Sequence, residues 1–362
     1  MPFDVKAHLR ALVEAHGPPG HEDSVRALLR EAWAPLTDTL EQDRLGSLIG
    51  IKRATHPVDP PRRIMLAAHM DEIALMVSGI LDGFLLVQRV GGIDARVMPA
   101  QPVLVHGRRP LPGVVATMPP HLLTALARSK YTPAGELLID VGLPPEEVDA
   151  LVRVGDLVTL DVPMLDLLGS RVAGKAMDDR ACVAAVTACL YALQGMYHAW
   201  DVYAVATVQE ERGLHGATTS AYATAPDIAI ALDVTFAPQP GVDSDASCDL
   251  GGGPGIGIGP NFHPKLLEKI RATAALHEIK LQDDVLPGNS GTDAWAIQVA
   301  LEGVPTALLE VPIRSMHSPV ETADMRDIER AGRLLAHFIA ELDADFLRTI
   351  AWEGLPVPEV QA

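Results

Sequence analysis

Apolar residues in the first part of the chain follow two different periodicities. In the stretches 1–17 and 18–33 they recur on one side of a helical repeat, and the second stretch begins with residues that favour a helix N-terminus. The stretches 47–52 and 62–70 are shorter and strand-like, and the second is almost continuously apolar, as in a strand covered on both faces. These patterns predict two helices followed by strands of a buried sheet.

The pattern changes between residues 76 and 166. Short β-prone runs are separated there by Gly and Pro, and only residues 144–151 resemble a helix. Runs of this length and spacing are typical of a small barrel or sandwich. They comprise residues 84–92, 101–107, 111–118, 136–142 and 156–162.

Alternating strands and helices return after residue 166, which predicts a largely parallel sheet. Strands are expected at 200–209, 226–234 and 304–312, and helices at 178–195, 265–279 and 327–342. We therefore predict an α/β fold. One α/β domain, formed by residues 1–75 and 167–362, is interrupted by an inserted β domain at residues 76–166.

The composition indicates in which cellular compartment the protein works and which kinds of partner it can bind. The formal net charge of -18 repels phosphate backbones, which argues against nucleic acid and favours metal ions and free amines. The three cysteines have no metal-type spacing, which is typical of a reducing compartment, and Cys182 and Cys189 lie in an apolar helical pattern that places them in the core. The longest apolar stretch, 181–193, is too short to span a bilayer. We expect a cytoplasmic protein with no membrane partner.

Five short segments place His, Asp or Glu at or just beyond the end of an apolar run. Ligands of open α/β sheets bind in the crevice beyond the carboxyl ends of the strands. Carboxylates buried there without cations would be costly, and a pair of divalent metal ions removes that cost. The residues are His69, Asp71 and Glu72; Asp178 and Asp179; Glu210 and Glu211; Asp233; and His317 and Glu321.

Each segment also has an ordinary structural interpretation. Carboxylates complement the dipole of a helix N-terminus, and paired glutamates after a strand usually form a solvated turn. Two carboxyl groups flanking a bond would also suit glycoside hydrolysis, so an endoglucanase-like or other hydrolase is an alternative, as is an inactive scaffold of the same fold. The recurrence of all five segments at one topological position favours the metal site.

Longer motifs resemble the M42 family of metallo-aminopeptidases, which includes the tetrahedral aminopeptidases and their glutamyl aminopeptidase relatives. The resemblance covers essentially the whole chain, and only the combination of motifs is specific. It implies a zinc-exopeptidase-like domain with a mixed, largely parallel sheet and flanking helices, interrupted by a small β-barrel that mediates dimer contacts. The matching motifs are "HMDEIALMV", "VGGIDARV", "GVVATMPPHLL", "KAMDDRACVAAV", "VQEERGLHGA", "ALDVTFA", "SGTDAWAI" and "EGVPTALLEVPIRSMHSPVE".

The resemblance also implies a role for each site residue. Asp178 is expected to bridge two metal ions, with His69 and Glu211 on one ion and Asp233 and His317 on the other, although the sequence does not fix this pairing. The remaining expected roles are a general base at Glu210, a carboxylate at Asp71 that orients the His69 ring from the same strand face, and substrate-cleft residues at Thr292 and Asp293.

These roles together describe a dinuclear aminopeptidase. It would release N-terminal amino acids from short peptides through attack by a metal-activated water, with Glu210 moving the proton. The nitrogen and oxygen ligands suit Zn²⁺, Co²⁺ or Mn²⁺. The resemblance further implies self-association into dimers and tetrahedral dodecamers. Nothing in the sequence indicates which N-terminal residue is preferred.

Overall fold

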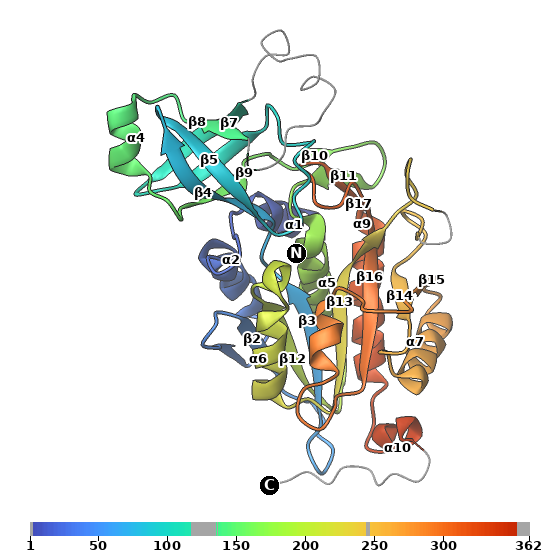
Figure 1. Ribbon diagram of the computed structural model, residues 1–362. Helices are drawn as coiled ribbons and strands as arrows, with labels where there is room; N and C mark the ends of the chain where they lie inside the picture. The colour runs from blue at the N-terminus through green and yellow to red at the C-terminus, as the bar shows by residue number, and fades with distance from the viewer. Residues whose placement is uncertain (1–2, 117–134, 136, 244–246, 353–362) are drawn as a thin grey trace.

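A mixed, 11-stranded sheet forms the larger part of the computed structural model (Figure 1). The structure describes residues 3–116, 135, 137–243 and 247–352. Along the sheet the strands follow the order β1 (Thr39–Gln42), β2 (Leu48–Lys52), β12 (Asp201–Thr207), β3 (Arg63–His69), β13 (Ile228–Phe236), β16 (Thr306–Arg314), β17 (Glu321–Asp324), β11 (Arg171–Gly174) and β10 (Leu165–Asp166), while β14 (Gly255–Ile258) joins β16 and β15 (Gln282–Val285).

The four central strands β12, β3, β13 and β16 run parallel to one another. All but the last residue of β13 are buried, as expected for parallel strands with helices on both faces. Because the strands are parallel, their carboxyl ends lie at the same edge of the sheet. This edge carries the residues that the sequence singles out.

Helices cover both faces of this sheet. Figure 1 shows α5 (Met177–Leu193) and α9 (Met325–Ala340) behind the strands and α6 (His215–Thr224) in front of them, where it contacts α8 (Asp293–Ile297). The remaining helices of this domain are α1 (Val5–Glu14), α2 (Asp23–Trp33), α7 (Pro264–Leu276) and α10 (Phe346–Ile350). Among the described residues, no helix has the length and apolar character needed to cross a membrane.

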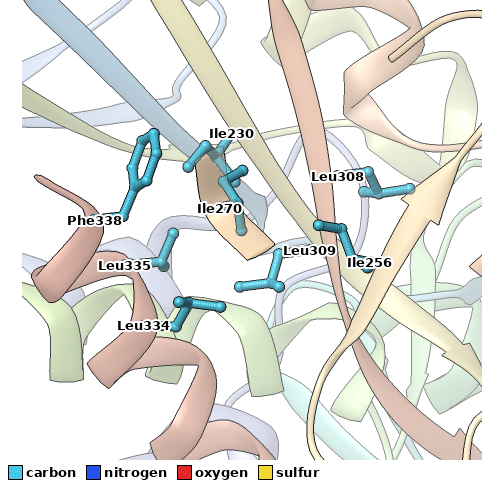
Figure 2. Close-up of a pocket in the computed structure, with 8 residues that line it drawn as sticks. All are labelled: Ile230, Ile256, Ile270, Leu308, Leu309, Leu334, Leu335 and Phe338. Atoms are coloured by element: carbon cyan, nitrogen blue, oxygen red, sulfur yellow. The ribbon is translucent and has the colours of Figure 1, made fainter. Parts of the chain in front are cut away.

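The core between the sheet and helices α7 and α9 is tightly packed. Figure 2 shows Ile230 of β13 beside Ile270 of α7, with Phe338 of α9 on one side of them and Leu308 of β16 beside Ile256 of β14 on the other. The space among these side chains is too small to hold a water molecule, so this region is a filled interior and not a ligand site. Cys182 and Cys189 are buried free thiols of α5, which confirms their predicted place in the core.

A closed antiparallel barrel is inserted between β3 and β11. Its strands follow the order β4 (Ala74–Leu81), β5 (Phe84–Val90), β8 (Leu138–Asp140), β7 (Pro110–Ala116), β6 (Pro102–His106) and β9 (Leu157–Leu160), and its described residues include the helix α4 (Pro145–Leu151). The barrel has its own apolar cluster, which includes Val87, Val103 and Val158. The predicted α/β fold with an inserted small β-barrel is confirmed.

The edges of the two parts differ in detail from the sequence pattern. The barrel strands begin at Ala74 and end at Leu160, and β10 pairs with β11 in the large sheet although it falls within the segment 76–166. Strand β12 ends at Thr207, and Glu210–Arg212 form a 3-10 turn instead of a strand end. Asp178 and Asp179 lack helical backbone angles, so the regular part of α5 starts after them.

Candidate metal centre

The first group of candidate ligands lies at the carboxyl ends of β3 and β13. His69 is the last residue of β3, and Asp233 is brought beside it because Ala67 pairs with Ala231 two residues earlier in each strand. Asp178 approaches from the start of α5, with its Oδ1 3.0 Å from His69 Nε2. The three buried side chains each offer an atom within 4.8 Å of the other two. This spacing suits a shared cation.

A second group lies next to the first and is more exposed. It consists of Asp178, Glu211 and His317, again with one atom of each within 4.8 Å of the others. His317 Nε2 is 3.2 Å from Asp178 Oδ2 and 3.3 Å from Glu211 Oε1. The Asp178 carboxylate therefore faces both groups, one oxygen toward each, as a bridging ligand would.

The structure groups the candidate ligands differently from the pairing that the resemblance suggested. His69 lies with Asp233, and Glu211 lies with His317, instead of His69 with Glu211. The cause is the strand order, in which β13 is a direct neighbour of β3, while Glu211 sits on the turn after β12 and reaches toward the loop that carries His317. Strand order is not readable from the order of the motifs along the chain.

Glu210 projects toward the first group. Its Oε2 is 3.9 Å from His69 Nε2, and its side chain is mostly buried. Burial raises the pKa of Glu210 to about 10, against the opposing effect of His69 and with further support from Asp233 and Asp293. The position of the Glu210 carboxyl beside the candidate ligands would let it exchange a proton with a water molecule held there.

Asp71 holds the turn that carries both glutamates. Its Oδ1 accepts a hydrogen bond from the Glu210 N–H at 3.0 Å, and its Oδ2 accepts one from the Glu211 N–H at 3.1 Å. The nearest partner of His69 Nδ1 is the backbone oxygen of Asp71 at 3.2 Å, while the Asp71 carboxylate is 3.6 Å away. Strand β3 ends at His69, so the strand-face argument for Asp71 does not apply.

The charge balance of these side chains tests whether metal ions fit. Burial raises the pKa of Asp233 well above its usual range. Burial opposes the charged form of His317, yet hydrogen bonds to Asp178 and Glu211 raise its pKa to about 11. The carboxylates outnumber the imidazoles in the two ligand groups, so the side chains together carry an excess of negative charge. An all nitrogen and oxygen donor set with this excess of negative charge fits divalent ions.

The comparison with known proteins agrees with this chemistry. A family model described as M42 glutamyl aminopeptidase matches residues 46–334. The chain belongs to the M42 family. It is 36% identical to the lysyl aminopeptidase of Pyrococcus furiosus over 342 residues, which cover 92% of this chain and 96% of that relative.

Solved structures agree with the M42 assignment over the whole fold. The TET aminopeptidase of a marine sediment Thaumarchaeota archaeon superposes with a TM-score of 0.90 at 32% identity, covering 96% of this chain and 99% of that one. The TET1 peptidase of Pyrococcus horikoshii gives 0.82 at 30% identity, with 94% and 100% covered. The chain is therefore an aminopeptidase, a hydrolase that acts at peptide N-termini, and its family is metal-dependent.

Glu321 organises both ligand groups of this M42 enzyme from β17. Its Oε2 accepts a hydrogen bond from the Asp178 N–H at 3.1 Å, and its Oε1 accepts one from the His317 N–H at 2.7 Å. Burial raises the pKa of Glu321 to about 8. The sequence places Glu321 among the acidic positions but gives it no role, because a carboxylate that binds two backbone amides leaves no distinct pattern.

A buried cluster of charged side chains lies next to the ends of the strands that carry the ligands. Lys175 Nζ is 2.7 Å from Glu72 Oε2, and Arg180 Nη2 is 3.2 Å from Glu72 Oε1. Asp179 Oδ2 accepts a hydrogen bond from the His69 N–H at 3.2 Å. In the sequence, Glu72 lies three residues after His69, while Lys175 and Arg180 lie on either side of Asp178. Lys175 and Arg180 went unassigned in the sequence, and their only signal was their place in the "KAMDDR" motif.

The two candidate cleft residues, Thr292 and Asp293, lie at the N-terminus of α8. Asp293 Oδ2 accepts a hydrogen bond from Thr207 Oγ1 at 2.5 Å, whereas its buried Oδ1 has no partner among the described residues. Burial raises the pKa of Asp293 to about 6. Thr292 occupies the N-cap position without a side-chain capping bond. Their predicted contact with substrate stays a prediction.

The barrel contributes backbone to the wall of the centre. A Cβ atom at Gly92 would lie 2.2 Å from His317 Nδ1, and one at Gly91 would lie 2.9 Å from Glu211 Oε2. Gly91 also has a φ of +88°, which favours glycine. These two residues follow β5, so the end of a barrel strand packs directly on the second ligand group.

Proposed function

We propose that this aminopeptidase uses two divalent metal ions to release N-terminal amino acids from short peptides. The observation that carries the proposal is the position of Asp178, whose two carboxylate oxygens face different ligand groups. His69 and Asp233 would complete one site, and Glu211 and His317 the other. Two ions bound there would polarise the first peptide carbonyl and lower the pKa of a shared water.

The protein side chains supply the remaining steps. Glu210 Oε2 would take a proton from the attacking water and return it to the departing amine. Asp71 holds Glu210 and Glu211 at fixed positions through their backbone amides, so the base and a ligand move as one unit. The excess of acidic groups at the centre also attracts the cationic N-terminus of a peptide. The donor set suits Zn²⁺, Co²⁺ or Mn²⁺.

We also propose self-association. The Pyrococcus horikoshii TET1 peptidase, which shares this fold, can assemble into a tetrahedron or a large octahedral shell. Dimers built through the inserted barrel and tetrahedral dodecamers of this chain would place the metal centre within a comparable shell. Native mass spectrometry of the purified chain measures the state directly, and a purely monomeric protein would contradict the proposal.

Metal titration tests the catalytic proposal. The chelated protein would be reconstituted with Zn²⁺, Co²⁺ or Mn²⁺, and hydrolysis of Leu-, Glu- and Lys-p-nitroanilides would be followed together with metal content. We expect no activity after chelation and full recovery at two ions per chain. Hydrolysis that persists in the presence of chelator would contradict the proposal. Metal-independent activity on β-glucan would contradict it too and would favour the glycoside hydrolase alternative.

A further inference from the structure

A cavity of about 330 Å³ lies between the barrel and the catalytic domain. Its described lining includes Gly20 from the loop between α1 and α2, Arg89 and Val90 from β5, and Gln209 and Arg212 from the turn after β12. Small-ligand pockets typically have volumes of about 300–1,000 Å³. The cavity therefore has room for the end of a short peptide.

Two guanidinium groups give this cavity a charge opposite to that of the whole chain. The formal net charge is -18, yet the described lining contains Arg89 and Arg212 and no acidic residue. Arg89 Nη1 makes one long hydrogen bond of 3.4 Å, to the backbone oxygen of Ile93. Within the described ranges, the guanidinium of the exposed Arg212 has no hydrogen bond or ion pair. Neither guanidinium forms a salt bridge among the described residues, although the charge of Arg89 helps to lower the pKa of the Asp94 carboxyl. Planar guanidinium groups are suited to bind a carboxylate.

The same two segments form the cavity and the metal centre. Gln209 and Arg212 flank Glu210 and Glu211 in the 3-10 turn, and the turn thus presents the glutamates to the ligand groups and its outer residues to the cavity. Val90 immediately precedes Gly91 and Gly92, which pack on Glu211 and His317. A peptide of a few residues, at roughly 3.3–3.6 Å per extended residue, can bridge such neighbouring sites.

We propose that this cavity binds the free α-carboxylate of a short peptide whose N-terminus lies at the metal centre. The inference rests on the proposed aminopeptidase function and adds a substrate class to it, namely zwitterionic peptides with a free C-terminus. Arg89 and Arg212 hold the carboxylate, and Gln209 adds a neutral polar side chain beside them. Long chains cannot place their C-terminus there, so the cavity selects for short substrates.

The test compares free and amidated substrates. Values of kcat/KM would be measured for Leu-Gly-Gly and Leu-Gly-Gly-amide with the metal-loaded enzyme, with Arg212→Gln and with Arg89→Gln. We expect the ratio of free to amidated substrate to fall about tenfold in each variant, through KM. Arg109→Gln makes the same charge change on the β6–β7 hairpin, which does not line the cavity, and should keep the ratio of the unchanged enzyme.

A second substrate pair separates the two sources of a carboxylate. Leu-Glu-Gly-amide and Leu-Gln-Gly-amide differ only in a side-chain carboxylate. If the arginine variants lose a preference for the Glu peptide while the free-to-amide ratio stays constant, the cavity binds a side chain and the α-carboxylate proposal is overturned. Unchanged ratios for both pairs, with normal metal-dependent hydrolysis of Leu-p-nitroanilide, overturn this inference alone. Absence of that hydrolysis in the unchanged enzyme overturns the proposed function instead.

Discussion

The two ligand groups share Asp178 but differ in how the chain builds them. His69 and Asp233 stand at the ends of buried parallel strands, and the His69 side chain is 2% exposed. Glu211 and His317 stand on a 3-10 turn and a loop, and the His317 side chain is 32% exposed. Strands fix side chains more rigidly than loops, so we expect the first group to be preformed and the second to be the one open to metal exchange and to substrate.

The largest expected effect follows from the residue that the two groups share. Asp178→Asn removes the negative charge that faces both His69 and His317, so neither group can hold a divalent ion tightly. We expect metal content to fall from two ions to none after dialysis and peptidase activity to fall to background. Retention of one ion would show that the groups are independent. Thermal unfolding of the same variant checks that the fold persists.

Loss of the base should leave both groups loaded. Glu210→Gln keeps the shape of the side chain but cannot accept a proton, and general acid–base catalysis contributes about 10²- to 10⁴-fold. We expect kcat to fall by this amount while metal content stays at two ions per chain. Metal analysis and steady-state kinetics on the same preparation measure both quantities. Normal turnover in this variant would contradict the role of Glu210.

The difference between the groups predicts an order of metal loss. Glu211→Gln weakens only the exposed group and should leave one ion bound at the buried group. Asp233→Asn is the matched change in the buried group. In the unchanged enzyme, slow titration with chelator should remove one ion well before the other, and Glu211→Gln should abolish the early phase. Loss of both ions at a single rate would contradict the proposed difference in metal retention between the two groups.

The smallest effect is expected at Glu321, which touches the groups only through backbone amides. Gln in its place can accept one of the two hydrogen bonds from Asp178 and His317 but meets the other amide with an NH₂ group. Such supporting partners typically change metal affinity or activity by about 10–100-fold. The control is Glu341→Gln at the C-cap of α9, where Glu341 pairs with His277. Competition with a metal indicator measures the affinities.

The sequence predicted the components of the centre better than their arrangement. The ends of apolar runs marked the five segments that contain His69, Asp178, Glu211, Asp233 and His317, and the resemblance to the M42 family selected these residues within the segments. The pairing of Asp233 with His69 depends on β13 lying beside β3, which no local pattern encodes. The partners of Asp71 also escaped prediction, because its carboxylate binds backbone amides that are distant in sequence.

Elements at the edges were harder to predict than those at the centre. Strand β13 is nearly all buried, so its apolar run was clear, whereas β1 and β10 are mostly exposed and contain polar residues such as Glu41 and Asp166. Their pairing comes from neighbouring strands and not from their own composition. For the same reason the sequence pattern placed β10 within the inserted segment, whereas in the structure it pairs with β11 of the large sheet.

Gly92 joins two parts of the molecule that otherwise have separate cores. A Cβ atom added to Gly92 would lie only 2.2 Å from His317 Nδ1, so the backbone after barrel strand β5 packs directly against this imidazole of the catalytic domain. An inserted module is usually free to drift in position over evolutionary time, provided that it still folds. Here a shift of the barrel would first displace His317 and so alter the metal centre. Selection on the reaction would therefore also constrain the position of a module whose described residues supply no ligand side chain to the metal centre.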